Sequence, residues 1–195
     1  MIILLGGFLG SGRRVLARKI AKRLGFYYYN IERKKLRAFK FNTNREVRHR
    51  TIQPRSDVER RRMYAQVVEE FPLLSKMYPD IVIDDAFHRA GPREYFFSEA
   101  KRYFRDMVFV WVDSDEKWVG ERFVHMLKKK VIRSIEDARR RRLSAKKRFQ
   151  PFKDEPITFI SGSIADREKD VEDLVQLVRT RYSITSDYTK SLLGS

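Results

Sequence analysis

The chain has 195 residues and a formal net charge of +17, with 43 Lys and Arg against 26 Asp and Glu. This length fits one domain with a full core, and the excess positive charge favours a polyanionic partner over a small neutral metabolite. The absence of cysteine excludes disulfides, thiolate zinc sites and cysteine nucleophiles, and the three histidines lack metal-ligand spacing. With no signal-peptide pattern and no apolar stretch of membrane length, we expect a cytoplasmic protein without a membrane partner.

The first elements along the chain are an apolar strand over residues 2–5, a glycine-rich loop over residues 7–14 and a helical pattern over residues 15–24. The loop matches the phosphate-binding pattern G-x-x-x-x-G-K-[ST] except at its last two positions, which are Arg13 and Arg14. Such a loop turns backbone N–H groups toward an anion, and the following helix adds a partial positive charge. The predicted phosphate-binding residues are Gly7, Gly10, Ser11, Gly12, Arg13 and Arg14.

The two arginines change the chemistry of this loop. Arg13 keeps a positive charge where the pattern has Lys, although its planar fork is larger. Arg14 replaces the hydroxyl that normally binds Mg²⁺, and a guanidinium cannot coordinate a cation. Either phosphates and acidic side chains alone hold Mg²⁺, or the loop binds phosphate without metal.

Four further short apolar or aromatic segments predict buried strands, and helical patterns lie between them. The strands are expected over residues 26–30, 81–84, 107–112 and 157–160, and the helices over residues 57–71, 95–104, 116–127, 135–149 and 166–182. Strands that alternate with helices favour a three-layer α/β/α domain with a mostly parallel five-stranded sheet. We expect one domain over residues 1–183, with a basic lid-like region at about 120–152 and a flexible tail at 184–195.

Arginine-rich segments at residues 45–62 and 139–148 are candidate contacts for the phosphates of RNA or DNA. Phe39 and Phe41 alternate with basic residues beside a segment, 40–56, that lacks apolar periodicity, and their rings are candidates for stacking on bases. A solvated basic surface without nucleic acid is the alternative.

The predicted strand at residues 81–84 ends in two carboxylates, Asp84 and Asp85. In P-loop proteins an Asp at this place holds Mg²⁺ or its water, so both are candidate metal ligands. The alternative is an Asp that caps the loop after the strand.

Several segments in order resemble the small P-loop kinases related to polynucleotide 5′-kinase domains and zeta toxins. The first is the loop at residues 7–14. Asn30-Ile31-Glu32-Arg33 is similar to the family's D-x-x-R element, and Asp84-Asp85-Ala86-Phe87 is similar to its D-A-T-F element. The remaining matches are Arg93 and three pieces similar to the family's lid: Glu121-Arg122-Phe123, residues 134–138 and residues 149–152. The resemblance implies transfer of the γ-phosphoryl group of ATP, with Mg²⁺, to a hydroxyl of a nucleic acid, nucleotide or small metabolite.

The resemblance also assigns roles to individual residues. Asn30, Arg33 and Arg93 match positions that bind substrate, and Arg122 matches a lid cation. The family's base is the Asp of D-x-x-R; here Asn30 stands in its place and cannot accept a proton, so Glu32 or Asp85 would replace it. The implied catalytic residues are Glu32, Asp84, Asp85 and Arg122.

Three function classes remain open. The first is an ATP-dependent kinase that uses its arginines in place of the usual loop residues. The second is a kinase fold that binds nucleotide or nucleic-acid phosphate without turnover, favoured by the changes at Arg13, Arg14 and Asn30. The third is a GTP-dependent protein, because residues 6–12 also resemble the loop of metallochaperone GTPases, although the [NT]-K-x-D element and that family's cysteines are missing.

Overall fold

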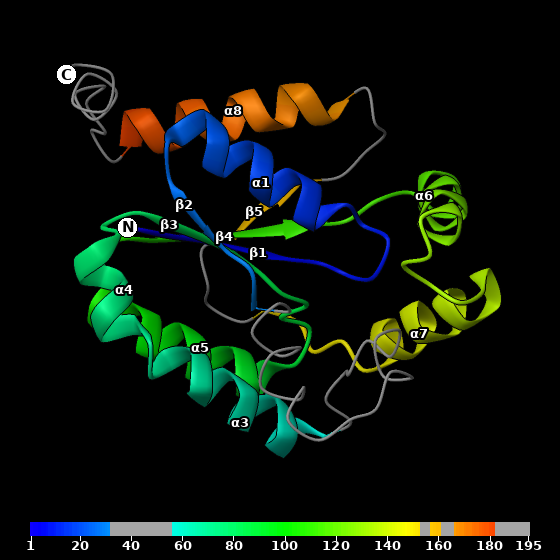
Figure 1. The fold of residues 1–195 in the computed structure, drawn as a ribbon, viewed down its shortest axis with the longest axis horizontal. Coiled ribbons are helices and arrows are strands. Elements are labelled where there is room, and N and C mark those ends of the chain that lie inside the picture. The colour runs from blue at the N-terminus through cyan, green and yellow to red at the C-terminus, as the bar shows by residue number, and fades with distance from the viewer. Residues whose placement is uncertain (32–55, 153–156, 161–165, 182–195) are drawn as a thin grey trace.

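The computed structural model describes residues 1–31, 56–152, 157–160 and 166–181. These residues contain a parallel sheet of five strands in the order β2-β3-β1-β4-β5 (Figure 1). The strands are β1 (Ile2–Gly6), β2 (Tyr27–Tyr29), β3 (Ile81–Asp84), β4 (Met107–Val112) and β5 (Ile157–Ile160). The expected α/β fold with a parallel sheet is therefore confirmed.

Both faces of the sheet are buried along β1 and β3, where every residue is buried and all but Gly6 and Asp84 are apolar. On β1, Ile2 and Leu4 point into one core cluster, whereas Ile3 and Leu5 point into the other. This alternation follows from the two-residue period of a strand. The register aligns Leu5 with Asp84 on β3, so the end of β1 and the end of β3 lie side by side.

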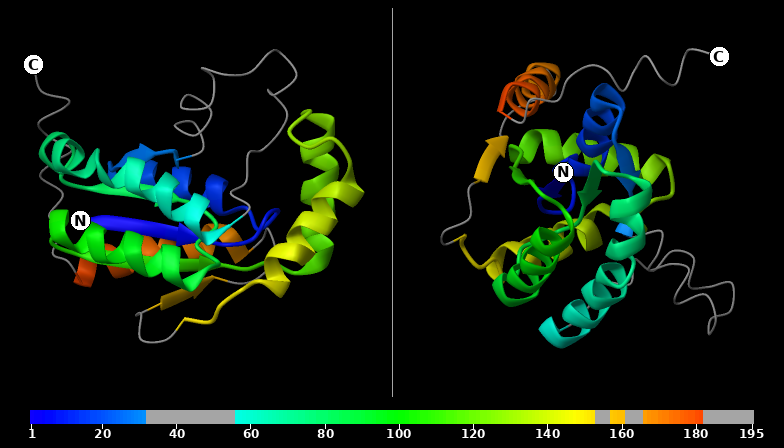
Figure 2. Two further views of the ribbon diagram at one scale, coloured as in Figure 1. Left: turned by 90° about the horizontal axis from the view of Figure 1, so that it is seen from below. Right: turned by 90° about the vertical axis from the view of Figure 1, so that its left-hand side faces the viewer.

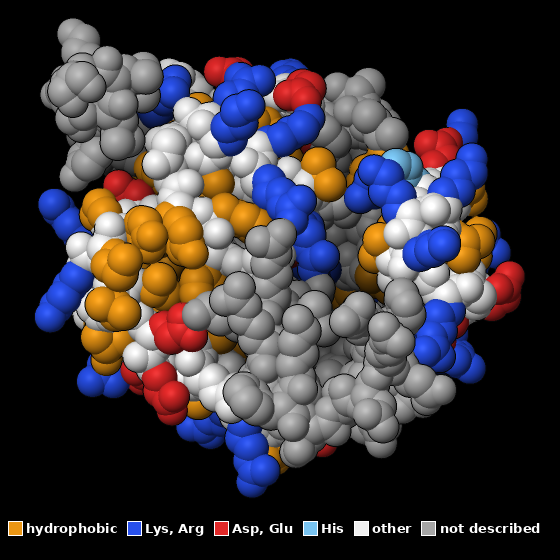
Figure 3. Space-filling model, in the orientation of Figure 1, with side chains coloured by type: hydrophobic (Ala, Val, Ile, Leu, Met, Phe, Trp, Pro, Cys, Tyr) orange, Lys and Arg blue, Asp and Glu red, His pale blue; other side chains and the backbone are white. Residues whose placement is uncertain are grey.

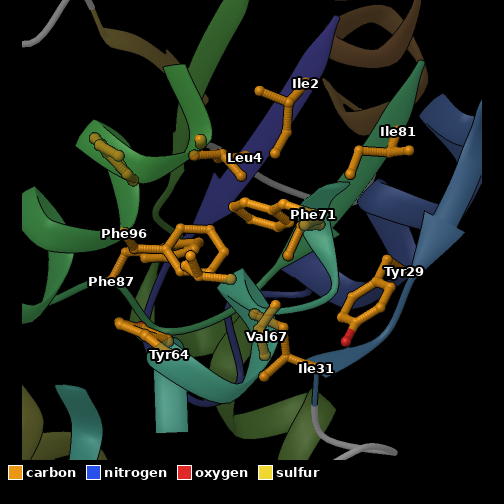
Figure 4. Packing of buried hydrophobic residues seen from close by; sticks show 14 of the residues in the cluster. Ile2, Leu4, Tyr29, Ile31, Tyr64, Val67, Phe71, Ile81, Phe87 and Phe96 are labelled. Carbon is orange, nitrogen blue, oxygen red and sulfur yellow. The ribbon is translucent and has the colours of Figure 1, made fainter. Parts of the chain in front are cut away.

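One face of the sheet is covered by α1 (Arg13–Leu24) and α8 (Asp166–Arg181), and the other by α3 (Asp57–Val68), α4 (Phe71–Met77) and α5 (Ala90–Tyr103) (Figures 1 and 2). The larger cluster lies under the second group and is rich in aromatic rings such as Phe71, Phe87 and Phe96 (Figure 4). These rings meet edge-on or tilted, with Phe71 and Phe96 centroids 5.4 Å apart.

The helix predicted over residues 57–71 corresponds to α3, which ends three residues earlier than expected. Its beginning is as expected, because the Ser56 hydroxyl accepts a hydrogen bond from the Glu59 N–H. The first helix ends at Val68 and a second begins at Phe71, with Pro72 in its first turn. Proline fits the start of a helix but not its interior, which explains the break.

Two more helices, α6 (Glu116–Lys128) and α7 (Ile135–Lys147), lie beyond the carboxyl ends of the strands (Figures 1 and 2). The Asp115 and Ser134 side chains cap them by accepting hydrogen bonds from the Trp118 and Asp137 N–H groups. Most of their residues fall in the region 120–152, whose lid-like role stays a prediction. None of the helices in the described ranges has the length and apolar character needed to cross a bilayer. The segment 40–55, Phe39, Phe41 and the tail 184–195 lie outside the described residues.

Candidate functional site

The loop between β1 and α1 has a backbone that requires glycine. Gly10 and Gly12 have φ angles of 88° and 82°, which side-chain-bearing residues rarely adopt. A Cβ atom on Gly12 would lie 2.4 Å from Cη2 of Trp118, and one on Gly10 would lie 2.8 Å from Cε1 of Phe123. Helix α6 therefore packs directly on the loop, and the glycines allow that close approach.

Side chains bind the carbonyl groups of the loop. The Arg13 guanidinium donates from Nη1 to the Gly7 carbonyl at 2.7 Å. The Ser114 hydroxyl, which follows β4, donates to the Ser11 carbonyl at 3.0 Å. The loop conformation is thus fixed from the β4 side and from its own helix.

Some of the loop's N–H groups have no acceptor in the part of the chain that the structure describes. The Gly7 N–H donates to the Ala86 carbonyl at 3.3 Å, but those of Gly10 and Gly12 donate to no described group. They belong to the turn that leads into the N-terminus of α1, where the helix dipole is positive. This arrangement of donors suits an anion.

The carboxylate of Asp84 lies at the end of β3 among cationic and hydroxyl donors. Its Oδ2 is 3.6 Å from Arg13 Nε and 3.9 Å from Arg14 Nε, and its side chain is only 1% exposed. The Tyr28 hydroxyl donates to its Oδ1. Burial, followed by the charge of Asp84, raises the pKa of Tyr28 well above its usual value, so the phenol remains protonated.

Asp85 is also buried, on the other face of the sheet. Its Oδ2 accepts a hydrogen bond of 2.7 Å from the Tyr64 hydroxyl and lies 3.6 Å from Arg60 Nη1. Nearby His88 is 4% exposed, and burial, together with the positive charge of Arg60, lowers its pKa to about 3. The imidazole is therefore neutral at physiological pH.

These carboxylates do not fit a Mg²⁺ site. The hydroxyl position is occupied by Arg14, and Asp84 and Asp85 each lie beside guanidinium groups and a phenol. Among the described residues, no group of at least three His, Cys, Asp or Glu side chains is placed to hold a metal ion. Mg²⁺ prefers an octahedral set of oxygen ligands, which this arrangement does not supply.

One buried arginine of α7 binds the loop. Arg142 of α7 is 2% exposed and donates from Nη1 to the Leu9 carbonyl at 3.1 Å. Its guanidinium also lies 5.7 Å from the Phe8 ring centroid and 3.3 Å from the Glu116 carboxylate. Part of the predicted basic segment 139–148 is therefore unavailable to nucleic acid, because this arginine is used inside the fold.

Arg122 lies on α6, with its guanidinium 5.6 Å from the Trp118 ring centroid. The same indole packs on Gly12, so Arg122 and the loop are both neighbours of Trp118. Burial lowers the pKa of Arg122 from its usual value, and the side chain remains cationic.

Arg93, an expected substrate-binding residue, is buried at 1% exposure. It donates to the carbonyls of Phe87, Gln150 and Pro151 at 3.1–3.2 Å. These hydrogen bonds connect residues 150–151, which follow α7, to Phe87, which follows β3. Arg93 therefore stabilises the fold at this point. Asn30 follows the carboxyl end of β2, and the loop follows the carboxyl end of β1, so in this parallel sheet both lie at the same end of the strands. Glu32 and Arg33 lie outside the described residues.

Sequence reasoning missed Tyr28, Ser114, Trp118 and Arg142. A signal for Arg142 was present, because Ile135, Ala138, Arg142 and Ala145 recur at helical spacing along one face of α7. The run of four arginines from 139 to 142 concealed that period. No pattern in the sequence marks Tyr28 or Ser114.

No family model matches the chain, and no curated protein matches it in sequence. Solved structures do share its architecture. A sugar kinase from Janibacter sp. HTCC2649 is 13% identical, with 94% of this chain and 95% of that chain covered and a TM-score of 0.61. A gluconokinase from Sinorhizobium meliloti 1021 is 15% identical, with coverage of 92% and 95% and a TM-score of 0.58. Kti12 from Chaetomium thermophilum, in complex with ADP-AlF3, is 18% identical, with coverage of 91% and 97% and a TM-score of 0.60. This chain therefore has a P-loop kinase-like fold.

Proposed function

We propose that this protein binds a nucleotide, with the phosphates of ATP held by the loop from Gly7 to Arg14. The proposal rests on the hydrogen bonding of the loop's backbone groups. Its carbonyls at Gly7 and Ser11 are bound by side chains, whereas the N–H groups of Gly10 and Gly12 have no acceptor among the described residues. A polyphosphate supplies the acceptors that these groups lack.

Equilibrium binding of ATP tests this proposal. Wild type and Gly120→Ala are expected to bind alike, because a Cβ on Gly120 meets nothing within 4 Å. Gly12→Ala is expected to lose binding, because its Cβ would displace Trp118 and because residues with a side chain rarely adopt a φ angle of 82°. Parallel titrations with GTP establish which base is preferred. Equal affinities of Gly12→Ala and wild type would contradict the proposal.

An ATP-dependent phosphotransferase is the second candidate, favoured by the lid that covers the loop. Helix α6 packs on Gly10 and Gly12, and α7 bonds to Leu9 through Arg142. In this reaction the bond from the γ-phosphorus to its bridging oxygen breaks, an acceptor hydroxyl oxygen bonds to the phosphorus, and the hydroxyl proton passes to a base. Because several sequence segments resemble those of polynucleotide 5′-kinases and zeta toxins, a nucleic-acid 5′-hydroxyl is the first acceptor to test.

Formation of ADP that depends on a 5′-hydroxyl oligonucleotide would establish the transferase. Asp84→Ala is expected to abolish turnover, because it removes the acid that lies beside Arg13 and Arg14. ATP binding without ADP formation, with every acceptor tested, would leave nucleotide binding as the function.

A nucleic-acid partner is a further part of the proposal, supported by the net charge of +17. Figure 3 shows Lys and Arg side chains over the side of the molecule where α6 and α7 lie. Arg139 and Lys147 of α7 are exposed, as is Arg148, which follows the helix. Binding of single-stranded RNA and of DNA, measured by fluorescence anisotropy, should weaken steeply as salt rises. Binding that is absent or insensitive to salt would contradict this partner.

A further inference from the structure

Two guanidinium groups lie beside Asp84, at a place where P-loop proteins have an acid that holds Mg²⁺ or its water. Arg14 is the residue at the motif position that normally supplies a hydroxyl to Mg²⁺. Its Nε is 3.9 Å from Oδ2 of Asp84, the acid at the end of β3. Arg13 Nε lies 3.6 Å from the same oxygen atom.

This cluster is set in place by the fold rather than by surface contacts. Asp84 is 1% exposed because β3 lies between β1 and β2 in the sheet. Its second oxygen accepts a hydrogen bond from Tyr28 of the neighbouring strand. Arg13 is anchored by its hydrogen bond of 2.7 Å to the Gly7 carbonyl. Asp84 and Arg13 are thus held by the sheet and by the loop, and Arg14 is placed beside them by the first turn of α1.

The charge of the cluster suits a phosphate group directly. The two guanidinium groups carry two positive charges and the Asp84 carboxylate carries one negative charge, so the cluster keeps a net positive charge. Each guanidinium offers several N–H donors in a planar fork that matches phosphate oxygens. A Mg²⁺ ion carried in by a nucleotide would instead meet Arg14 at the place of its missing ligand. The positive charge of Arg14 would repel that ion.

We propose that the loop binds nucleoside polyphosphates in their metal-free form, with Arg13 and Arg14 in the place of Mg²⁺. This proposal rests on the proposed nucleotide-binding function and specifies the ligand that the same site selects. Arg14 and Asp84 form the selecting pair: Asp84 orients the Arg14 side chain, and Arg14 excludes the metal. Addition of Mg²⁺ should therefore weaken ATP binding rather than strengthen it.

The test is calorimetric titration of ATP in EDTA and in excess Mg²⁺, at constant ionic strength. We expect the Kd of wild type to be at least about tenfold lower in EDTA. Arg14→Ser restores the motif hydroxyl and is expected to lose that preference or to reverse it. Lys22→Ser removes one positive charge from an exposed position of the same helix, and it should behave as wild type.

The outcomes separate this inference from the function on which it rests. Binding only with Mg²⁺, or equal Kd values in the two buffers, overturns metal-free selection and leaves nucleotide binding intact. No binding in either buffer overturns the proposed function itself. If Arg14→Ser does not fold, as judged by its thermal unfolding, Arg14→Gln serves instead and is expected to raise the Kd in EDTA about tenfold or more. An unchanged Kd for that variant also overturns the inference.

Discussion

Arg142 links α7 to the loop between β1 and α1, so its replacement is expected to destabilise the protein. The Arg142→Ala substitution deletes hydrogen bonds to two carbonyls, those of Leu9 at 3.1 Å and Ser114 at 3.4 Å. Hydrogen bonds from a charged group contribute about 1.5–3 kcal/mol each, and the second of these is long. The ion pair with Glu116 adds little, because Glu116 is 66% exposed and becomes hydrated when the pair is lost. We expect a loss of about 3 kcal/mol.

Urea unfolding followed by tryptophan fluorescence measures this loss, since Trp111 and Trp118 are buried and become hydrated when the chain unfolds. A loss of 3 kcal/mol would also lower Tm by about 6–12 °C in a domain of this size. Arg139→Ala is the matched control, because it removes the same side chain from an exposed position of α7 and should change stability by less than about 0.5 kcal/mol. Equal stabilities of the two variants would refute the reasoning.

Three other perturbations test separate parts of the structure. Arg93→Ala should cost about 3–5 kcal/mol in urea unfolding, because three carbonyls lose a buried donor; a stable variant with weakened ligand binding would support the substrate role instead. The pKa of His88 is lowered from 6.5 to about 3, so as pH falls the unfolded state takes up the proton before the folded state does. The free energy of unfolding should therefore drop by about 1.4 kcal/mol per pH unit below about pH 6. His88→Gln should reduce this dependence on pH between about pH 6 and 5. An unchanged slope would show that this histidine is not the cause. Gly120→Ala should raise the free energy of unfolding by about 0.5–1 kcal/mol, because Gly120 lies inside a helix and its Cβ meets nothing within 4 Å. Gly12→Ala should lower it, because its Cβ collides with Trp118. A Gly12→Ala variant more stable than Gly120→Ala would contradict the packing of α6 on the loop.

The local features of the fold could be predicted from the sequence because they depend on neighbouring residues. The apolar runs of β1, β3, β4 and β5 and the glycine loop appear within short windows, and the structure places them close to the expected residues. Pro72 carried the information that divides α3 from α4, but the apolar residues on both sides of it continue at helical spacing. Periodicity alone therefore did not reveal the break.

The arrangement around the carboxylates could not be predicted because it depends on strand order. Tyr28 reaches Asp84 only because β2 pairs with β3, and Arg14 reaches it only because β3 also pairs with β1. The sequence shows Asp84 and Asp85 as adjacent carboxylates, yet consecutive residues at the end of a strand point to opposite faces. Asp85 consequently meets Tyr64 of α3 rather than the loop arginines.

The most direct measurement of nucleotide binding at the loop is an NMR titration of protein labelled with ¹⁵N at glycine only. The chain has nine glycines, so the spectrum is simple and contains its own controls. On addition of ATP, the amide signals of Gly10 and Gly12 should shift, because their N–H groups gain phosphate acceptors. Those of Gly91 and Gly120, on the surfaces of α5 and α6, should stay in place. Saturating ATP that leaves Gly10 and Gly12 unshifted would contradict binding at this loop.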